Sequence, residues 1–226
     1  MGRPSLREER RRELTLALER VLARVGVADA SIAAVADEAG VAPGLVHHHF
    51  KNRDELLTTL VRELDRRFVA ARAAPPGTPP HEVLHRTVDA AVALRGDAGR
   101  RAARAWVALY AEALGSPHVG GVVRALVLRE WRTLTATWER LGASRDDAQR
   151  RAAAVVATIL GSLVFGALLP GTAVGFAAPS LHTLLRAWGA ADADDRVADD
   201  PAGPTAHTTP RPPHLCAGPE ASCRCC

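Results

Sequence analysis

Residues 31–57 read SIAAVADEAGVAPGLVHHHFKNRDELL and decide the fold of the N-terminal part of the chain. Ser31 is a favourable N-cap, and the apolar residues after it recur at helical spacing, so a first short helix is predicted to begin there. Gly40 suits the left-handed conformation that ends a helix, and Pro43 suits the first turn of a second one. The stretch therefore predicts two short helices joined by a tight turn.

This pattern is typical of a helix-turn-helix, in which the second helix enters the major groove of DNA. In the predicted second helix, Val46 and Phe50 are four residues apart and are expected to be buried together. The opposite side then carries Gly44, Leu45, His47 and His48. Spacing alone also fits a small helical bundle that binds no DNA, so the residue types have to decide.

From Gly44 onward, GLVHHHFKNRDELL resembles the DNA-binding signature of the TetR family of bacterial transcriptional repressors. Residues 31–41 resemble the family's preceding helix, and the resemblance covers about residues 10–60. It implies that Gly44, Leu45, His47 and His48 face base edges or nearby backbone. It also implies phosphate contacts from Ser31, His47, Lys51 and Arg53. His47 replaces the family's usual tyrosine and Arg53 its usual lysine, but both can still donate a hydrogen bond to a phosphate.

The composition predicts an all-α protein. Hydrophobic residues make up 47% of the chain but aromatic residues only 4%, so the core has to consist mainly of alanine, leucine and valine. Such a composition favours helices, and no alternating strand with hairpin turn signals is present. Caps, breaks and apolar spacing predict about nine helices, near residues 5–25, 31–39, 43–50, 52–73, 81–95, 97–114, 117–141, 144–169 and 179–188.

The chain is predicted to have three parts. Residues 1–57 form a three-helix DNA-binding domain, residues 58–189 form a helical domain for ligand binding and dimerisation, and residues 190–226 form a disordered tail rich in aspartate and proline. The tail ends in a cysteine cluster made of Cys216, Cys223, Cys225 and Cys226. Four thiols could bind a soft metal or zinc, although the paired C-x₂-C spacing of structural zinc sites is missing. A metal- or thiol-responsive regulator that senses through this tail is therefore the alternative function.

Aromatic side chains in the middle of the chain are the candidate ligand-binding residues: Trp106, Tyr110, Trp131 and Trp138. With Glu130 beside them, they could line a pocket for an apolar or cationic ligand through cation–π contacts and a carboxylate countercharge. Large aromatic residues at helical spacing can equally be ordinary core. The segment WVALYAEAL from Trp106 is similar to the choline-responsive BetI-like branch of the TetR family, which implies a quaternary-ammonium effector.

The last two predicted helices are unusually apolar. A helix that is apolar on most sides is either buried within its own chain or shared with a partner. The TetR resemblance implies a homodimer through a four-helix bundle, with an interface that includes Ile159, Leu163, Leu181, Leu185 and Trp188. A two-fold dimer would present its two recognition helices to two DNA half-sites about one turn apart.

Several other classes are disfavoured. The consecutive residues His47, His48 and His49 point about 100° apart on a helix, so they cannot converge on one metal ion. There is no glycine-rich phosphate loop and no nucleophile elbow, so we expect no enzyme, no cofactor and no metal site. No signal peptide and no run of 18 apolar residues are present, so a cytoplasmic protein without a membrane segment is expected. The prediction is a homodimeric repressor that a small molecule releases from palindromic operator DNA.

Overall fold

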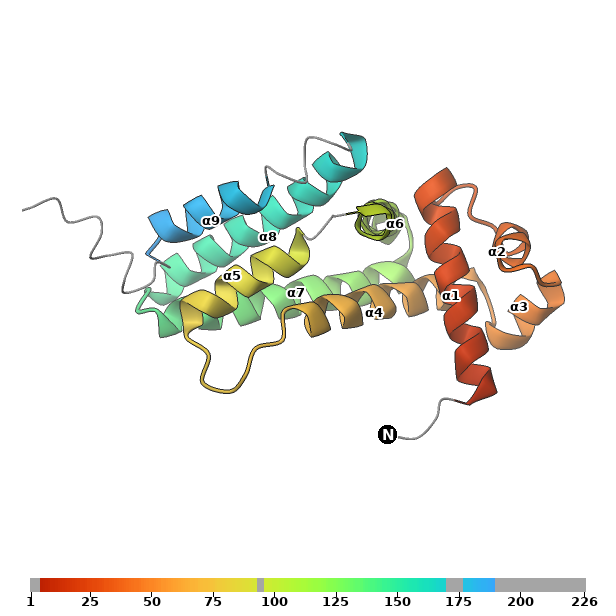
Figure 1. The fold of residues 1–226 in the computed structure, drawn as a ribbon, viewed down its shortest axis with the longest axis horizontal. Coiled ribbons are helices and arrows are strands. Elements are labelled where there is room, and N and C mark those ends of the chain that lie inside the picture. The colour runs from red at the N-terminus through yellow and green to blue at the C-terminus, as the bar shows by residue number, and fades with distance from the viewer. Residues whose placement is uncertain (1–4, 93–95, 170–176, 190–226) are drawn as a thin grey trace, which may run out of the picture. The chain divides into compact units, whose positions relative to one another are not determined.

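The computed structural model describes residues 5–92, 96–169 and 177–189. These ranges contain nine α-helices and no strand, which confirms the all-α prediction (Figure 1). The helices are α1 (Leu6–Val25), α2 (Ile32–Ala39), α3 (Pro43–His49), α4 (Arg53–Ala71), α5 (Pro80–Ala91), α6 (Gly96–Gly115), α7 (Pro117–Arg140), α8 (Arg145–Leu168) and α9 (Ala177–Ala187). The predictions for the tail, including its four cysteines, concern residues outside the described ranges.

The helix boundaries near the N-terminus follow from local capping. Ser5 and Glu8 form a reciprocal capping box at the start of α1, and the Ser31 hydroxyl accepts a hydrogen bond from the backbone N–H of Ala34 at the start of α2. Gly40 ends α2 in the left-handed conformation, with φ 66° and ψ 37°. Pro43 is the first residue of α3. These contacts confirm the two short helices and the tight turn between them.

One hydrophobic core joins the helix-turn-helix to the helices behind it. Val46 and Phe50 are almost fully buried, as predicted, and they pack with leucines of α1 and α4. The same cluster continues into α6 and α7 through Leu109 and Val119. Helices α4 and α6 therefore share one continuous core with α1, α2 and α3, which we call the head. This core continues across residue 57.

A second core cluster holds α5, α7, α8 and α9 together. It includes Leu84 and Val88 of α5, Trp138 of α7, and Leu181 and Leu185 of α9. Leu181 and Leu185 are 1% and 0% exposed, so both side chains are already buried within their own chain. The α9 stripe at helical spacing is the side that packs on α5, and the dimer interface stays a prediction.

The outward side of α8 carries large apolar residues. Val164, Phe165 and Leu168 are 44%, 45% and 72% exposed, and Leu184 of α9 is 39% exposed. Ile159 and Leu163, which were predicted interface residues, turn inward toward a cavity, and Trp188 packs against Trp138. By length and composition alone, α8 is long and apolar enough to cross a membrane. Of the most apolar 18-residue stretch of this helix, 22% is buried within the described part of the chain. This exposed α8 surface has no covering partner within the described residues.

A close approach between α6 and α7 gives a stability prediction. A Cβ atom at Gly120 would lie 2.5 Å from the backbone oxygen of Ala113, whereas a Cβ at the neighbouring Gly121 would meet nothing within 4 Å. Gly120→Ala is expected to lower the free energy of unfolding by about 1–3 kcal/mol, because backbone has to shift. Gly121→Ala, the matched control, should stabilise α7 by up to about 1 kcal/mol. Urea unfolding of both variants measures this, and equal effects at the two positions would contradict the close approach.

Candidate DNA-binding surface and ligand cavity

Helix α3 has an exposed side, which carries the predicted DNA-binding residues, and a buried side, which carries Val46. Gly44, His47 and His48 are exposed and Leu45 is partly exposed, so the four predicted groove-facing residues share one surface. A Cβ at Gly44 would meet no protein atom within 4 Å, which leaves room for close approach by a ligand. His49 is the exception in the histidine run, since it is buried and its Nδ1 has no hydrogen-bond partner in the described part of the chain. Burial lowers the pKa of His49, and neighbouring positive charges on His48 and α1 add to this.

The groups predicted to contact phosphate differ in their surroundings. Ser31 and Lys51 are exposed at the ends of α2 and α3, where both side chains can reach outward. Arg11 of α1 holds the junction between α3 and α4: it donates to the backbone oxygen of His49 and to Glu55, and its guanidinium lies 4.2 Å from the centre of the Phe50 ring. The exposed face of α3 is thus held in place by contacts behind it.

Arg53 is engaged inside the protein. Its Nη2 donates to the Val27 oxygen at 2.6 Å and its Nε to the Ala30 oxygen at 3.2 Å. Its Nη1 pairs with Glu112 of α6 at 2.8 Å. The guanidinium that the family resemblance assigned to phosphate therefore joins the α1–α2 loop, the start of α4 and the end of α6.

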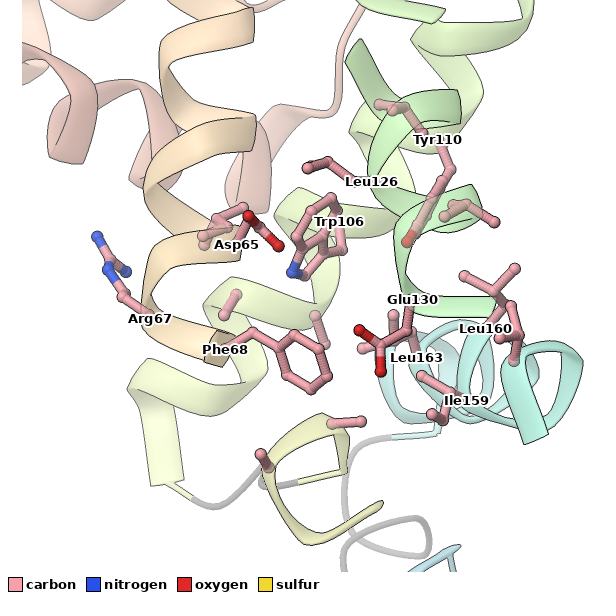
Figure 2. A pocket seen from close by; sticks show the side chains of 18 of the residues that line it. Asp65, Arg67, Phe68, Trp106, Tyr110, Leu126, Glu130, Ile159, Leu160 and Leu163 are labelled. Carbon is pink, nitrogen blue, oxygen red and sulfur yellow. The ribbon is translucent and has the colours of Figure 1, made fainter. Parts of the chain in front are cut away.

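A cavity of about 240 Å³ lies behind the head, between α4, α5, α6, α7 and α8 (Figure 2). Its walls are mainly aliphatic and aromatic. Trp106 and Tyr110, two of the predicted ligand-binding residues, line it with their rings 5.4 Å apart. The other main wall residues are Leu64, Asp65, Phe68, Ala103, Val123, Leu126, Val127, Glu130, Ile159, Leu160 and Leu163.

Trp131 and Trp138 are not among the residues that line this cavity. Trp138 is fully buried in the second core, and the Trp131 indole donates to the Gln149 backbone oxygen at 3.2 Å. The reason is helical geometry, because Val123, Leu126, Val127 and Glu130 form the inner face of α7 and Trp131 points about 100° away from Glu130. Of the four predicted ligand-binding aromatic residues, Trp106 and Tyr110 therefore line this cavity and Trp131 and Trp138 do not, while the role of all four in ligand binding stays a prediction.

Two carboxylates lie in the cavity wall. Asp65 accepts hydrogen bonds from the two terminal nitrogens of Arg129 at 2.5 and 2.9 Å, so its charge is matched. Glu130 uses its Oε1 to pair with Arg72 at 2.8 Å, while its Oε2 is buried without a hydrogen-bond partner among the described residues. Burial raises the pKa of Glu130, which Arg72 only partly opposes. Burial, with a contribution from Asp65, also raises the pKa of Tyr110 to about 12, so the phenol is neutral.

Comparisons with known proteins agree with this geometry. A family model described as "Bacterial regulatory proteins, tetR family" matches residues 14–60, and one described as "BetI-type transcriptional repressor, C-terminal" matches residues 80–188. The chain belongs to the TetR family. An HTH-type transcriptional regulator BetI from Cronobacter sakazakii is 30% identical over 174 residues, which are 76% of this chain and 85% of that protein. BetI from Brucella suis biovar 1 is 34% identical over 166 residues, 70% and 80% of the two chains.

Solved structures share the fold of this TetR-family protein. A transcriptional regulator from Rhodococcus sp. Rha1 has a TM-score of 0.72 and 26% identity, with 78% of this chain and 94% of that chain covered. A putative transcriptional regulator from Saccharomonospora viridis, solved in complex with choline, has a TM-score of 0.64 and 23% identity, with 80% and 95% covered. The named relatives are transcriptional regulators, which confirms the prediction of a DNA-binding regulator rather than an enzyme.

Sequence reasoning missed the cavity residues of α4 in this TetR-family regulator. Asp65 and Phe68 are three residues apart on one face of α4. The presence of a charged aspartate in this apolar wall is explained only by its contact with Arg129, which lies 64 residues further along the chain. The one available signal for these cavity residues was a single charged residue, Asp65, within an otherwise apolar helix face. Within the described ranges, no three His, Cys, Asp or Glu side chains are arranged to hold a metal ion.

Proposed function

We propose that this TetR-family protein is a cytoplasmic, homodimeric repressor that binds palindromic operator DNA and releases it when an apolar cation occupies the cavity. The observation that carries the ligand class is Glu130. Its Oε2 is buried and unpartnered in a wall that is otherwise aromatic and aliphatic. An unpaired buried carboxylate oxygen is costly, and a bound cation would compensate it.

The residues around Glu130 favour a cation that forms few hydrogen bonds. Both oxygens of Asp65 accept from Arg129, whereas Glu130 gives only Oε1 to Arg72, so Glu130 Oε2 is the carboxylate oxygen left to face a ligand. Phe68 and Trp106 line the same cavity as Glu130 (Figure 2), and aromatic rings attract cations. A quaternary ammonium group combines positive charge with an apolar surface. The similarity to BetI proteins and the choline held by the Saccharomonospora regulator point to the same class.

The cavity is connected to the DNA-binding head by two helices. Helix α4 contributes Phe68 to the wall and begins at Arg53 beneath the helix-turn-helix. Helix α6 contributes Trp106 and Tyr110, and two residues later Glu112 pairs with Arg53. A ligand that prefers a different separation of α4 and α6 would therefore change the position of the head. Repression would end by a population shift between two arrangements of the dimer.

The proposed dimer uses the outward side of α8. Gly161 is exposed, and a Cβ there would meet nothing within 4 Å. It lies on the same side as Phe165 and Leu168, so a second helix could approach closely and cover the exposed apolar residues. A two-fold axis here would place two copies of α3 for two half-sites, with Ser31, Lys51 and the exposed α3 residues at the DNA.

Fluorescence anisotropy of a labelled DNA duplex from the gene's own upstream region tests this function. At fixed salt, which sets the strength of phosphate contacts, choline should release wild-type protein and its uncharged isostere 3,3-dimethylbutan-1-ol should not. Glu130→Gln should raise the choline concentration needed at least about tenfold, because the countercharge is lost. Glu139→Gln, an exposed glutamate on the same helix, is the matched control. Equal release by the neutral isostere, or unchanged choline sensitivity of Glu130→Gln, would reject the cation proposal.

A further inference from the structure

A second hollow, of about 510 Å³ and open to solvent, lies where α1 and α2 meet the first half of α6. It is lined by Arg20, Ala23, Arg24, Glu38, Asp97, Arg100, Arg101 and Arg104, and we call it the arginine cavity. Five arginines and two carboxylates give it an excess of three positive charges. We propose that the arginine cavity binds a small phosphorylated anion that carries a chain of two or three phosphate groups.

The pairing of charges inside the cavity leaves two arginines available. Glu38 accepts hydrogen bonds from Arg20 and Arg24 at 2.7 Å each, so one carboxylate is shared by two cations. Arg100 pairs with Asp97 on the first turn of α6. Arg101 and Arg104 have no carboxylate partner in the described ranges. The one hydrogen bond of Arg104 is long, 3.5 Å to the Ala23 oxygen.

The two arginines project from one helix into a hollow whose opposite wall is also cationic. Helix α6 brings Arg100, Arg101 and Arg104 toward α1, which presents Arg20 and Arg24 one turn apart. Like charges that converge on a hollow repel each other unless an anion lies between them. Guanidinium groups offer two parallel N–H donors that match phosphate oxygens.

Size and position favour a free small molecule over the DNA backbone. The cavity volume is within the usual range for small-molecule sites. Arg11 marks the end of α1 that contacts α3, and Arg20 lies nine residues further on, about 14 Å along the helix. Figure 1 shows α6 meeting α1 on the side away from α3. The site is thus separate from the exposed face of α3, and its occupant would tie α1 to α6.

Calorimetric titration of the full-length protein with inorganic triphosphate, without DNA, tests the proposal directly. Ionic strength is held constant with sodium chloride, and sodium sulfate serves as a second anion. Wild-type protein should bind triphosphate saturably and more tightly than sulfate. Arg101→Ala/Arg104→Ala should weaken this binding at least about tenfold, because two charge-assisted contacts are lost. Arg101→Lys/Arg104→Lys keeps the charges without the forked donors and should fall between the two.

The control is Arg124→Ala/Arg132→Ala, which removes two exposed arginines of α7 that have no ion pair within the described ranges. It should change triphosphate affinity by less than about threefold. Equal losses in Arg101→Ala/Arg104→Ala and Arg124→Ala/Arg132→Ala, or wild-type protein that binds triphosphate no more tightly than sulfate, would overturn the proposal. Thermal melts of each variant show that the comparison is made on folded protein.

A DNA titration separates this site from the operator surface. Without triphosphate, the Arg101→Ala/Arg104→Ala variant should bind the upstream duplex within about threefold of wild type, with the same salt dependence. If it loses DNA affinity and its salt slope falls, the cavity is part of the DNA-binding surface and the small-molecule proposal is overturned. Because the triphosphate titration uses no DNA, this result is independent of the proposed repressor function.

Discussion

Arg53→Ala is expected to lower the free energy of unfolding by about 2–3 kcal/mol, since two backbone oxygens and one carboxylate lose their donor. The Val27 and Ala30 oxygens and Glu112 all depend on this guanidinium. Its side chain is 32% exposed, so water can replace part of the loss. Urea unfolding of the full-length protein measures the change.

Two further variants decide between a structural and a DNA-contacting Arg53. Lys51→Ala, at an exposed neighbouring position, should lower DNA affinity and leave the free energy of unfolding unchanged. Arg53→Lys should be intermediate in stability, because an ammonium group cannot reach three acceptors as a planar fork does. If Arg53→Ala unfolds like wild type and loses only DNA affinity, then Arg53 contacts phosphate as the family resemblance implied.

Phe165→Glu is expected to convert the proposed dimer to a monomer and to weaken operator binding at least about a hundredfold. A carboxylate on the outward side of α8 would be buried against apolar residues of the second chain. A monomer also loses the gain that comes from holding two half-sites at once. Sedimentation equilibrium measures the oligomeric state, and fluorescence anisotropy measures the affinity for DNA.

Leu128→Glu is the matched control for this change. Leu128 of α7 is 40% exposed and Phe165 is 45% exposed, so both substitutions place a carboxylate at a similar depth. The control should remain dimeric and bind DNA like wild type. A dimeric Phe165→Glu variant with normal DNA affinity would show that the α8 surface is not the interface.

The helices were predictable because their signals are local. Each capping or turn residue affects the backbone only within about four positions, so its effect can be read directly from the sequence. These residues are Ser5 with Glu8, Ser31, Gly40 and Pro43. The burial of Val46 and Phe50 followed from the same short spacing. The helix-turn-helix and the exposed face of α3 could therefore be predicted before any tertiary contact was known.

The functional details depended on contacts between distant segments. Apolar spacing identified a stripe on α9, and the family resemblance assigned Leu181 and Leu185 to a dimer interface, but spacing could not show that both side chains are buried within their own chain. Aromatic content identified Trp106 and Tyr110 together with two tryptophans that pack elsewhere. Which apolar face turns inward is decided by the neighbouring helices.

The sequence by itself determined the nine described helices, the helix-turn-helix and the family to which the chain belongs. Only the tertiary structure decided the partners of the charged groups. Arg53 meets Glu112, Asp65 meets Arg129 and Arg72 meets Glu130 across 58 to 64 residues of chain. Caps and helical periodicity act over a few residues, whereas these pairs form only when packing of the apolar faces brings separate helices together.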